Sequence, residues 1–498
     1  MRVSEKLIFE KSVVGRRGVT FPKVAEVIDA YIPKKYQREI PLPLPEISEN
    51  DLIRHYTRLS SQTYGVDTGF YPLGSCTMKY NPKIHEEVAR YAGFANIHPL
   101  QPVQTVQGSL QLLYELQQYL CEISGMDQVS LTPSAGAQGE LAGMLMVRAY
   151  HKAAGRLGRC RVNVIIPDSA HGTNPASATL AGFNIQTVKT NAEGGIDIDD
   201  LMKVVDDKTA AMMLTNPNTL GLFEKEIGKI GKIIHDAGAL LYLDGANLNA
   251  LLGLTRPGDL GFDIVHFNLH KTFSTPHGGG GPGAGPVGVK SALIPFLPYP
   301  LIEKNTKRKT LSNSPLSGRE QVYHFEKGRR KSVGRVHGFY GNFGILLRAY
   351  TYIRRLGAEG LLAISRNTII NANYLKGLLE KSFPVPYSRP CMHEFVVTAK
   401  KFMPQGVHAW DIAKRLMDYG FYPPTVNFPL IVEEALMIEV PESESKETIE
   451  SFANAMRAIG DEIEKDPEKV TGAPHTRPIS RVDEVFAARR LNVRFLMP

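Results

Sequence analysis

Lys271 follows a short apolar run and precedes a loop of small residues. The run at 264–269 has the length and the branched and aromatic residues of a buried strand, and the loop contains the glycine row 278–281. An amine placed there would be desolvated and could act as a nucleophile towards carbonyls. A lysine that merely reaches from a strand end into solvent is an equally good interpretation of this stretch by itself.

The turn TPSAGAQG at 132–139 follows another apolar run and opens a helical pattern. Ser134 can cap that helix, and the small residues leave backbone N–H groups exposed to bind an anion. A capped helix without a ligand explains the turn about as well.

Two further polar side chains follow strand-like runs. His171 lies in the loop SAHGTNPAS at 169–177, and Asp244 comes directly after the run at 239–243. A carboxylate that ends a buried strand is costly unless a cation or N–H groups pair with it. The spacing between Asp244 and Lys271 leaves room for one crossover to another strand.

Strands and helices must alternate to bring these residues together. Alternation predicts an α/β fold with a large, mainly parallel sheet covered on both faces, and ligands bind at the carboxyl ends of such strands. The expected strands are at 129–131, 162–166, 185–188, 210–214, 239–243 and 264–269; expected helices include 110–123, 141–150, 198–205 and 227–237.

An anion cradle, an imidazole, a buried carboxylate and a lysine at one sheet edge are the groups that pyridoxal phosphate needs. The cradle would bind the phosphate, the carboxylate would keep the pyridine nitrogen protonated, and the lysine would hold the aldehyde as a Schiff base. A dinucleotide site is the competing interpretation, because 278–283 matches GxGxxG. Pro282 and Pro286 stand where its helix should begin, and Glu303 follows a Pro-rich loop rather than a strand, so we do not favour it.

Composition indicates an ordinary globular protein of 498 residues, with 43% hydrophobic and 22% charged residues. No apolar run could span a bilayer, and the N-terminus resembles no secretory signal.

The net charge of +8 is concentrated at 304–309 and 327–335, without interleaved aromatic residues. This pattern favours solvated surfaces over nucleic-acid binding, while binding of an acidic protein partner or a phosphate stays open. No CxxC pair occurs among Cys76, Cys121, Cys160 and Cys391, so we expect no metal site or disulfide framework and a cytoplasmic location.

Three parts are predicted along the chain: an N-terminal arm at 1–70 without a long periodic run, a large cofactor-binding domain at 71–340, and bridging helices with a small α+β domain at 341–498. In the last part we expect helices at 341–353, 358–379 and 408–417, strands at 394–397 and 436–440, a final helix with a stripe from Ile449 to Ile463, and irregular structure after Pro467.

Several motifs together resemble the glycine cleavage system P-protein family, the decarboxylating glycine dehydrogenases. The resemblance is to the C-terminal half of the long form, and therefore to subunit 2 of the two-subunit form, which TNPNTLGLFE at 215–224 also favours. It implies the aspartate aminotransferase fold (fold type I). The matching motifs are YPLGSCTMK (71–79), AGAQGE (135–140), SAHGTNPAS (169–177), DGAN (244–247), NLHKTF with the glycine row (268–283), HEF (393–395), AKRLMDYGF (413–421) and ESESK (442–446).

The resemblance also implies roles for individual residues. Lys271 would form the Schiff base, His171 would stack on the cofactor ring, and Asp244 would meet the pyridine nitrogen. Residues 71–77 would border the substrate, and Ser274 stands where the family commonly has a cysteine. The remaining cofactor-binding residues implied are Ser134, Ala135, Gly136, Asn247 and His270.

The implied activity is decarboxylation of glycine, with release of carbon dioxide and transfer of the aminomethyl group to the lipoyl arm of an H-protein. The implied assembly contains subunit 1, with two copies of each subunit, and involves neither nucleic acid nor membrane. Two alternatives remain open at this point: another fold type I pyridoxal-phosphate enzyme, such as an amino-acid decarboxylase or aminotransferase, and a silent scaffold subunit.

Overall fold

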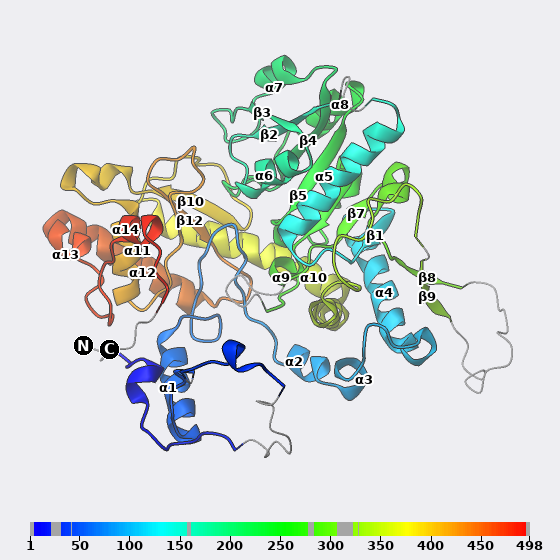
Figure 1. The fold of residues 1–498 in the computed structure, drawn as a ribbon. Helices are drawn as coiled ribbons and strands as arrows, with labels where there is room; N and C mark the ends of the chain where they lie inside the picture. The colour runs from blue at the N-terminus through cyan, green and yellow to red at the C-terminus, as the bar shows by residue number, and fades with distance from the viewer. Residues whose placement is uncertain are drawn as a thin grey trace. The chain divides into compact units, whose positions relative to one another are not determined.

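The computed structural model describes residues 4–20, 31–40, 42–156, 161–276, 283–305, 322–326 and 328–494 (Figure 1). These residues form two compact units, which we call the main unit (70–471) and the terminal unit (1–69 with 472–498). The glycine row 278–281, Pro282, Cys160, residues 306–309 and Lys327 lie outside the described ranges.

A seven-stranded sheet forms the centre of the main unit, with the strand order β1-β7-β6-β5-β4-β2-β3. Neighbouring strands from β6 to β3 are parallel, and β7 runs antiparallel to both β6 and β1. Each predicted strand of this region is present, whereas β7 was not predicted. The strands are β1 (Gln128–Ser130), β2 (Asn163–Pro167), β3 (Asn184–Val188), β4 (Thr209–Thr215), β5 (Leu240–Gly245), β6 (Ile264–Phe267) and β7 (Val287–Val289).

Helices cover both faces of this sheet because successive strand residues point to opposite sides. In β5, Tyr242 packs into the core beneath α5, while Leu241 and Leu243 belong to the core on the other face. Figure 1 shows α5 lying along the first of these faces. The helices of this region are α2 (Ile84–Ala89), α3 (Ala92–Ala95), α4 (Gln107–Ser124), α5 (Gly136–Ala153), α6 (Thr173–Leu180), α7 (Ile198–Val204), α8 (Ile227–Asp236) and α9 (Leu269–Thr272).

The long helix α10 (Phe343–Leu379) leads to a second, smaller sheet in the main unit. Gly357 has non-helical angles (φ 62°, ψ −172°), so α10 consists of two helical segments, as the sequence predicts. The small sheet is antiparallel in the order β10-β12-β11, and α12 buries its apolar stripe against it. These elements are β10 (Glu394–Thr398), α11 (Ala409–Asp418), β11 (Thr425–Val426), β12 (Ala435–Glu439), α12 (Lys446–Lys465) and α13 (Pro467–Thr471); a separate hairpin pairs β8 (Ile302–Lys304) with β9 (Tyr323–Phe325).

Helices at both ends of the chain were not predicted, and the expectation of irregular structure after Pro467 is wrong. Residues 1–70 contain the 14-residue helix α1 (Glu49–Gln62), whose N-cap Ser48 accepts a hydrogen bond from the Asp51 N–H. The tail after Pro467 contains α13 and α14 (Glu484–Arg489) instead of being irregular throughout. Side-chain caps start two of these helices, with Ser48 at α1 and Asp483 at α14. The division into three domains stays a prediction. It assigns 472–498 to the C-terminal domain, whereas in the structure these residues belong to the same compact unit as 1–69.

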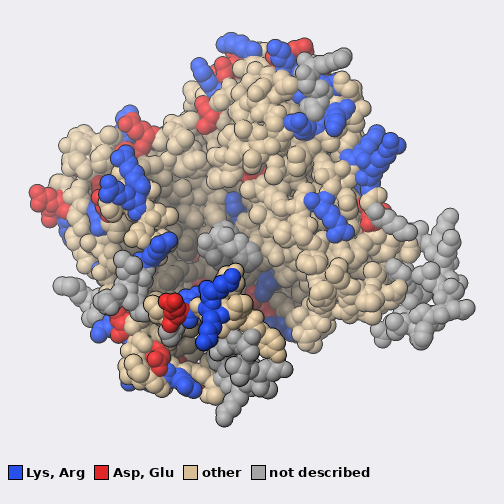
Figure 2. Space-filling view, viewed as in Figure 1, with Lys and Arg blue, Asp and Glu red and all other residues tan. Residues whose placement is uncertain are grey.

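Charge on the surface drawn in Figure 2 is interspersed. Lys and Arg lie in small groups among Asp and Glu, and residues of other types cover most of this face. Within the described ranges, no helix is long and apolar enough to cross a membrane.

Candidate active site

A cavity of about 290 Å³ lies at the carboxyl ends of β4, β5 and β6, next to the first residues of α5. Parallel strands and a helix N-terminus that meet in this way form the usual ligand crevice of an open α/β sheet. Its lining includes five of the residues singled out from the sequence, namely Gly136, His171, Asp244, His270 and Lys271. The other lining residues are Ser75, Cys76, Ala137, Glu140, Thr173, Thr215, Thr219, Ala246 and Asn268.

Lys271 lies in the short helix α9 rather than at the mouth of a strand, because β6 ends at Phe267. Its side chain reaches the cavity, and its Nζ donates a hydrogen bond of 2.8 Å to the carbonyl oxygen of Ser75. The interpretation of Lys271 as a lysine that merely extends into solvent is therefore wrong. A half-buried amine at a cavity wall is suitably placed to react with a bound carbonyl.

Asp244, at the end of β5, is 2% exposed and has a partner for each carboxylate oxygen. Oδ2 accepts a 2.9 Å hydrogen bond from Asn174 Nδ2, and Oδ1 accepts one of 2.9 Å from the Ala246 N–H. Burial opposes ionisation, but the facing His266 and the hydrogen bond from Asn174 outweigh it, so the pKa of Asp244 lies below its ordinary value. A negative charge therefore lines the cavity at neutral pH.

His266 supports this carboxylate, and the sequence analysis gave it no role. It is the register partner of Asp244 on β6, and its Nε2 lies 3.2 Å from Asp244 Oδ1. Its Nδ1 shares a 2.9 Å hydrogen bond with the hydroxyl of Tyr242. In the sequence, His266 is a histidine inside an apolar run, and the preceding predicted strand carries Asp244. Hydrophobic patterning does not indicate that the two residues lie opposite each other.

The start of α5 has an open N-terminus, but Ser134 does not cap it. Ala135 occupies the N-cap without a side-chain hydrogen bond, and the Ser134 N–H and hydroxyl both donate to Gln138 Oε1, at 2.6 and 3.0 Å. The predicted cap is therefore wrong. A β-carbon on Gly136 would lie 2.1 Å from Asn268 Oδ1, so glycine lets the helix start approach the end of β6. Uncapped N–H groups of this 18-residue helix fit an anion such as a phosphate.

His171 presents a neutral ring at the cavity. Its Nδ1 shares a 2.9 Å hydrogen bond with the Thr173 hydroxyl, which donates in turn to Glu140 Oε1 at 2.8 Å. Burial, helped by the positive charge of Lys271, lowers the pKa of His171 below its ordinary value. A neutral imidazole held by this chain of hydrogen bonds can stack on an aromatic ligand.

Not every predicted residue reaches the cavity. Ser134 and Ala135 do not line it, and the buried Asn247 donates to the carbonyl oxygen of Pro217 at 2.9 Å and to Glu394 Oε1 at 3.3 Å. Conversely, the sequence analysis missed two residues that line the cavity: Thr215, which ends β4, and Asn268, which follows β6. The buried atoms Thr215 Oγ1 and Asn268 Oδ1 have no hydrogen-bond partner among the described residues, which suits a polar ligand.

Family models and curated relatives similar to this chain both indicate a glycine dehydrogenase. Residues 364–476 match the family model "Glycine dehydrogenase, C-terminal domain", and 151–310 match "Aminotransferase class-V". The chain is 55% identical over 497 residues to a probable glycine dehydrogenase (decarboxylating) subunit 2 of Bacillus thuringiensis (strain Al Hakam), covering 99% of this chain and 98% of the relative. A Bacillus cereus (strain B4264) protein of the same description is equally similar.

The chain belongs to the glycine dehydrogenase (decarboxylating) subunit 2 family. The family resemblance predicted from the sequence is thereby confirmed. The fold also matches the crystal structure of a glycine decarboxylase (P-protein) of the glycine cleavage system in inhibitor-bound form, with a TM-score of 0.72 at 22% identity, over 87% of this chain and 95% of that one. Lactobacillus brevis glutamate decarboxylase matches with a TM-score of 0.62 at 14% identity, over 87% and 96% of the two chains. The predicted fold type I architecture is confirmed by these matches and by the aminotransferase class-V model.

In this glycine dehydrogenase subunit 2 relative, part of the loop 71–79 forms one wall of the cavity. Ser75 and Cys76 line it, and burial raises the pKa of the Cys76 thiol. Tyr71 is not among the lining residues; it stacks on Tyr422 with ring centroids 3.8 Å apart. The predicted contact of 71–77 with the substrate stays a prediction, although the loop's position beside Lys271 supports it.

Proposed function

We propose that this chain is the cofactor-bearing subunit of a glycine cleavage glycine dehydrogenase. It would decarboxylate glycine with pyridoxal phosphate, release carbon dioxide and pass the aminomethyl group to the lipoyl arm of an H-protein. Family membership supports the glycine cleavage role and the cofactor. The observation that carries the assignment to this site is a cavity lined by both the Lys271 amine and the buried carboxylate of Asp244.

The cavity residues fit pyridoxal phosphate. Lys271 would bind its aldehyde carbon, Asp244 would accept a hydrogen bond from its protonated ring nitrogen, and the start of α5 at Gly136 and Ala137 would bind its phosphate. The unpartnered oxygens of Thr215 and Asn268 are further candidates for contact with it. When bound, the cofactor supplies an electron sink for the pair left on glycine as the carboxylate departs.

The chain's own residues would position glycine and control charge. Asp244 is held ionised by its partners, so it would stabilise a positive charge on the ring nitrogen of the cofactor. His171 stays neutral, so its ring can cover the cofactor without adding charge. Lys271 would release the cofactor to glycine, and its free amine has an acceptor ready in the carbonyl oxygen of Ser75.

The partners follow from the family. The relatives' name "subunit 2" implies a partner subunit 1 in the glycine cleavage system. We propose two copies of each subunit and a lipoylated H-protein as co-substrate. The described cysteines Cys76, Cys121 and Cys391 are free thiols, which supports a reducing compartment, and we propose the cytoplasm.

The test compares the wild type with Lys271→Ala and with Lys400→Ala, a control at an exposed ion pair. After loading with pyridoxal phosphate, the wild type and the control should show visible absorbance and, with subunit 1 and an H-protein, glycine-dependent carbon dioxide release. Lys271→Ala should lose both. Absorbance that persists in Lys271→Ala would refute the assignment of this lysine, and turnover of another amino acid without any lipoyl protein would favour a different fold type I enzyme. A wild type that binds no cofactor would indicate a scaffold subunit.

A further inference from the structure

Two glutamates outside the cavity lining face one another in the small sheet. Glu394 opens β10 and Glu439 closes β12, and they are direct register partners in this antiparallel pair. They are 0% and 1% exposed, and oxygens of the two carboxyl groups lie within 4.8 Å of each other. Two ionised carboxylates directly opposite each other in a dry sheet would repel strongly.

Neutral groups, rather than cations, bind these carboxyl groups. Glu394 Oε2 accepts a 2.7 Å hydrogen bond from the Ser75 N–H, and Glu439 Oε1 accepts one from the Thr77 hydroxyl. Glu439 Oε2 has no hydrogen-bond partner among the described residues. The nearby His393, with Nε2 3.6 Å from Glu394 Oε1, adds no charge because burial lowers its pKa to about 3.

Burial and mutual repulsion keep a proton on this pair. Burial, and then the neighbouring Glu439, raise the pKa of Glu394 well above its ordinary value. Burial raises the pKa of Glu439 to about 7, against the hydrogen bond from Thr77. Above about pH 7 the pair therefore carries one proton, on Glu394, and one negative charge, on Glu439. The other titratable groups that act on it are Lys271, Lys79, Glu442 and Cys76.

The main chain of one residue, Ser75, links this pair to the proposed cofactor lysine. The Ser75 N–H donates to Glu394, and the Ser75 carbonyl oxygen accepts from Lys271 Nζ. Ser75 has φ +63°, a left-handed conformation that a non-glycine residue keeps only when its surroundings hold it. Gly74 packs so closely on β12 that an added β-carbon would lie 2.2 Å from the Met437 side chain. The loop is thus held in place by the packing of Gly74 on β12 and by the two hydrogen bonds of Ser75.

We propose that Glu394 and Glu439 act as one acid unit that shares a single proton and, through the main chain of Ser75, holds the Lys271 amine beside the cavity. The inference rests on the proposed role of Lys271. The unit supplies one negative charge to match one ammonium group when Lys271 is not joined to the cofactor. Both glutamates are positioning residues: Glu394 acts through Ser75, and Glu439 acts through Glu394 and Thr77.

The shared proton can be tested on the full chain without cofactor by infrared spectroscopy. The wild type should retain the absorption of a buried protonated carboxyl group at pH 8, and a second such group should appear as the pH falls through about 7. Glu394→Gln should lose the pH 8 band, while Glu439→Gln should lose it at a lower pH than the wild type does. Glu433→Gln, an exposed control in the same part of the chain, should match the wild type. A wild type without this band at pH 8, or a band that survives in Glu394→Gln, would overturn the proposal.

The link to Lys271 is tested by the rate at which an amine-reactive reagent labels it at pH 8, read by peptide mass spectrometry. Because the neutral Glu394 becomes a neutral glutamine, Glu394→Gln should leave this rate unchanged, and its amide oxygen can still accept from the Ser75 N–H. The double variant Glu394→Gln/Glu439→Gln removes the negative charge, so Lys271 should be labelled several-fold faster. Equal steps for the first and second substitution would mean that both carboxyl groups are ionised, and would contradict the shared proton. If the wild type forms visible absorbance through Lys271 but lacks the infrared band, only this inference fails; if the absorbance is missing, the proposed function fails.

Discussion

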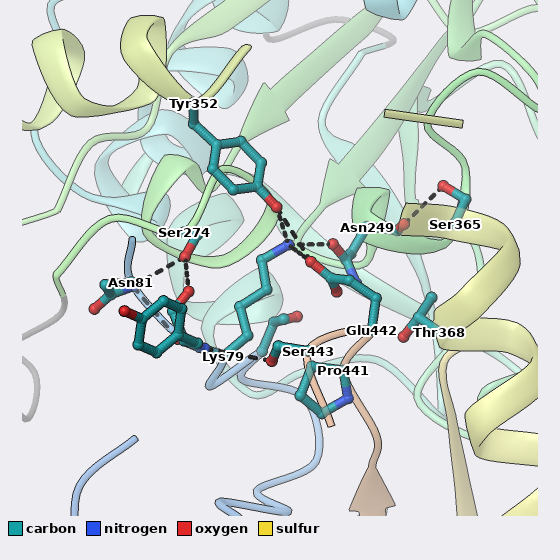
Figure 3. A network of polar contacts seen from close by, with 12 residues as sticks. Lys79, Asn81, Asn249, Ser274, Tyr352, Ser365, Thr368, Pro441, Glu442 and Ser443 are labelled. Carbon is teal, nitrogen blue, oxygen red and sulfur yellow. Dashed lines mark hydrogen bonds and ion pairs between the residues drawn. The ribbon is translucent and has the colours of Figure 1, made fainter. Parts of the chain in front are cut away.

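Lys79 is a buried lysine in the loop that contacts Lys271, and its structural role can be tested quantitatively. Its side chain is 1% exposed, and its Nζ contacts Asn249 Oδ1 at 2.8 Å, the Tyr352 hydroxyl at 3.1 Å and Glu442 Oε1 at 2.8 Å (Figure 3). These partners join the loop 71–79 to α10 and to the segment after β12. Breaking this network should therefore loosen the loop that contacts Lys271.

Lys79→Met keeps most of the side-chain volume and removes the charge. Among the described residues, the Glu442 carboxylate, 13% exposed, would then keep only the Tyr352 hydroxyl at 3.1 Å as a hydrogen-bond donor, and it would face other acidic groups. Removing one partner of a buried ion pair costs about 3–5 kcal/mol, whereas replacing both partners is often nearly neutral. We therefore expect Lys79→Met to lower the free energy of unfolding by about 3 kcal/mol or more, and Lys79→Met/Glu442→Gln to recover at least half of that loss.

The assay is urea unfolding followed by two spectroscopic probes, whose coincidence checks that one transition is being measured. Lys400→Met is the matched control, because its partner Glu433 is exposed; it should cost no more than about 1 kcal/mol. A cost below about 1 kcal/mol for Lys79→Met would refute the reasoning. So would a double variant that loses the sum of the two single effects, since the charges would then not be coupled.

Further predictions concern the sheet, the cofactor carboxylate and acid stability. Asp244→Asn should slow glycine decarboxylation by about 100-fold or more while weakening cofactor retention much less, because the charge acts on the reacting state; turnover and equilibrium dialysis measure the two effects. Gly245→Ala should destabilise the protein by about 2 kcal/mol or more, because its β-carbon would lie 2.0 Å from the His266 carbonyl oxygen, whereas Gly231→Ala, with 3.6 Å to its nearest neighbour, should be tolerated in thermal unfolding. Hydrogen bonding lowers the pKa of Glu462 to about 2, so its contribution should be present above pH 4.5 and lost as the pH falls towards 2; Glu462→Gln should lack this part of the acid transition, about 1 kcal/mol after allowing for solvent screening.

The sequence predicts the large sheet well because its strands are continuous apolar runs between helical patterns. β7 was missed because Val287–Val289 is only three residues long, contains a glycine and pairs antiparallel to its neighbours. α1 was missed because its residues are mostly polar, and its N-cap gives a weaker signal than an apolar stripe. Short strands and capped polar helices depend on contacts with other parts of the chain, and the pattern of apolar residues in the sequence does not reveal such contacts.

The site was predictable where a polar residue follows a strand, as with Asp244, and not where the decisive contact is between distant segments. Serine is a common N-cap residue, yet the Ser134 hydroxyl donates to the Gln138 side chain instead of capping the helix. His266 became visible only through the β5–β6 register. Glu394 and Glu439 look like ordinary strand acids in the sequence, and only the register of β10 with β12 places them opposite each other beside the 71–79 loop.

The central claim is that Lys271, among all the lysines of the chain, holds pyridoxal phosphate. The most direct measurement is borohydride reduction of the cofactor-loaded protein, followed by digestion and mass spectrometry of the peptides. A pyridoxyl group on the peptide that contains Lys271, and on no other, is the predicted result. A label on Lys79, a label spread over exposed lysines, or no label at all would contradict the account.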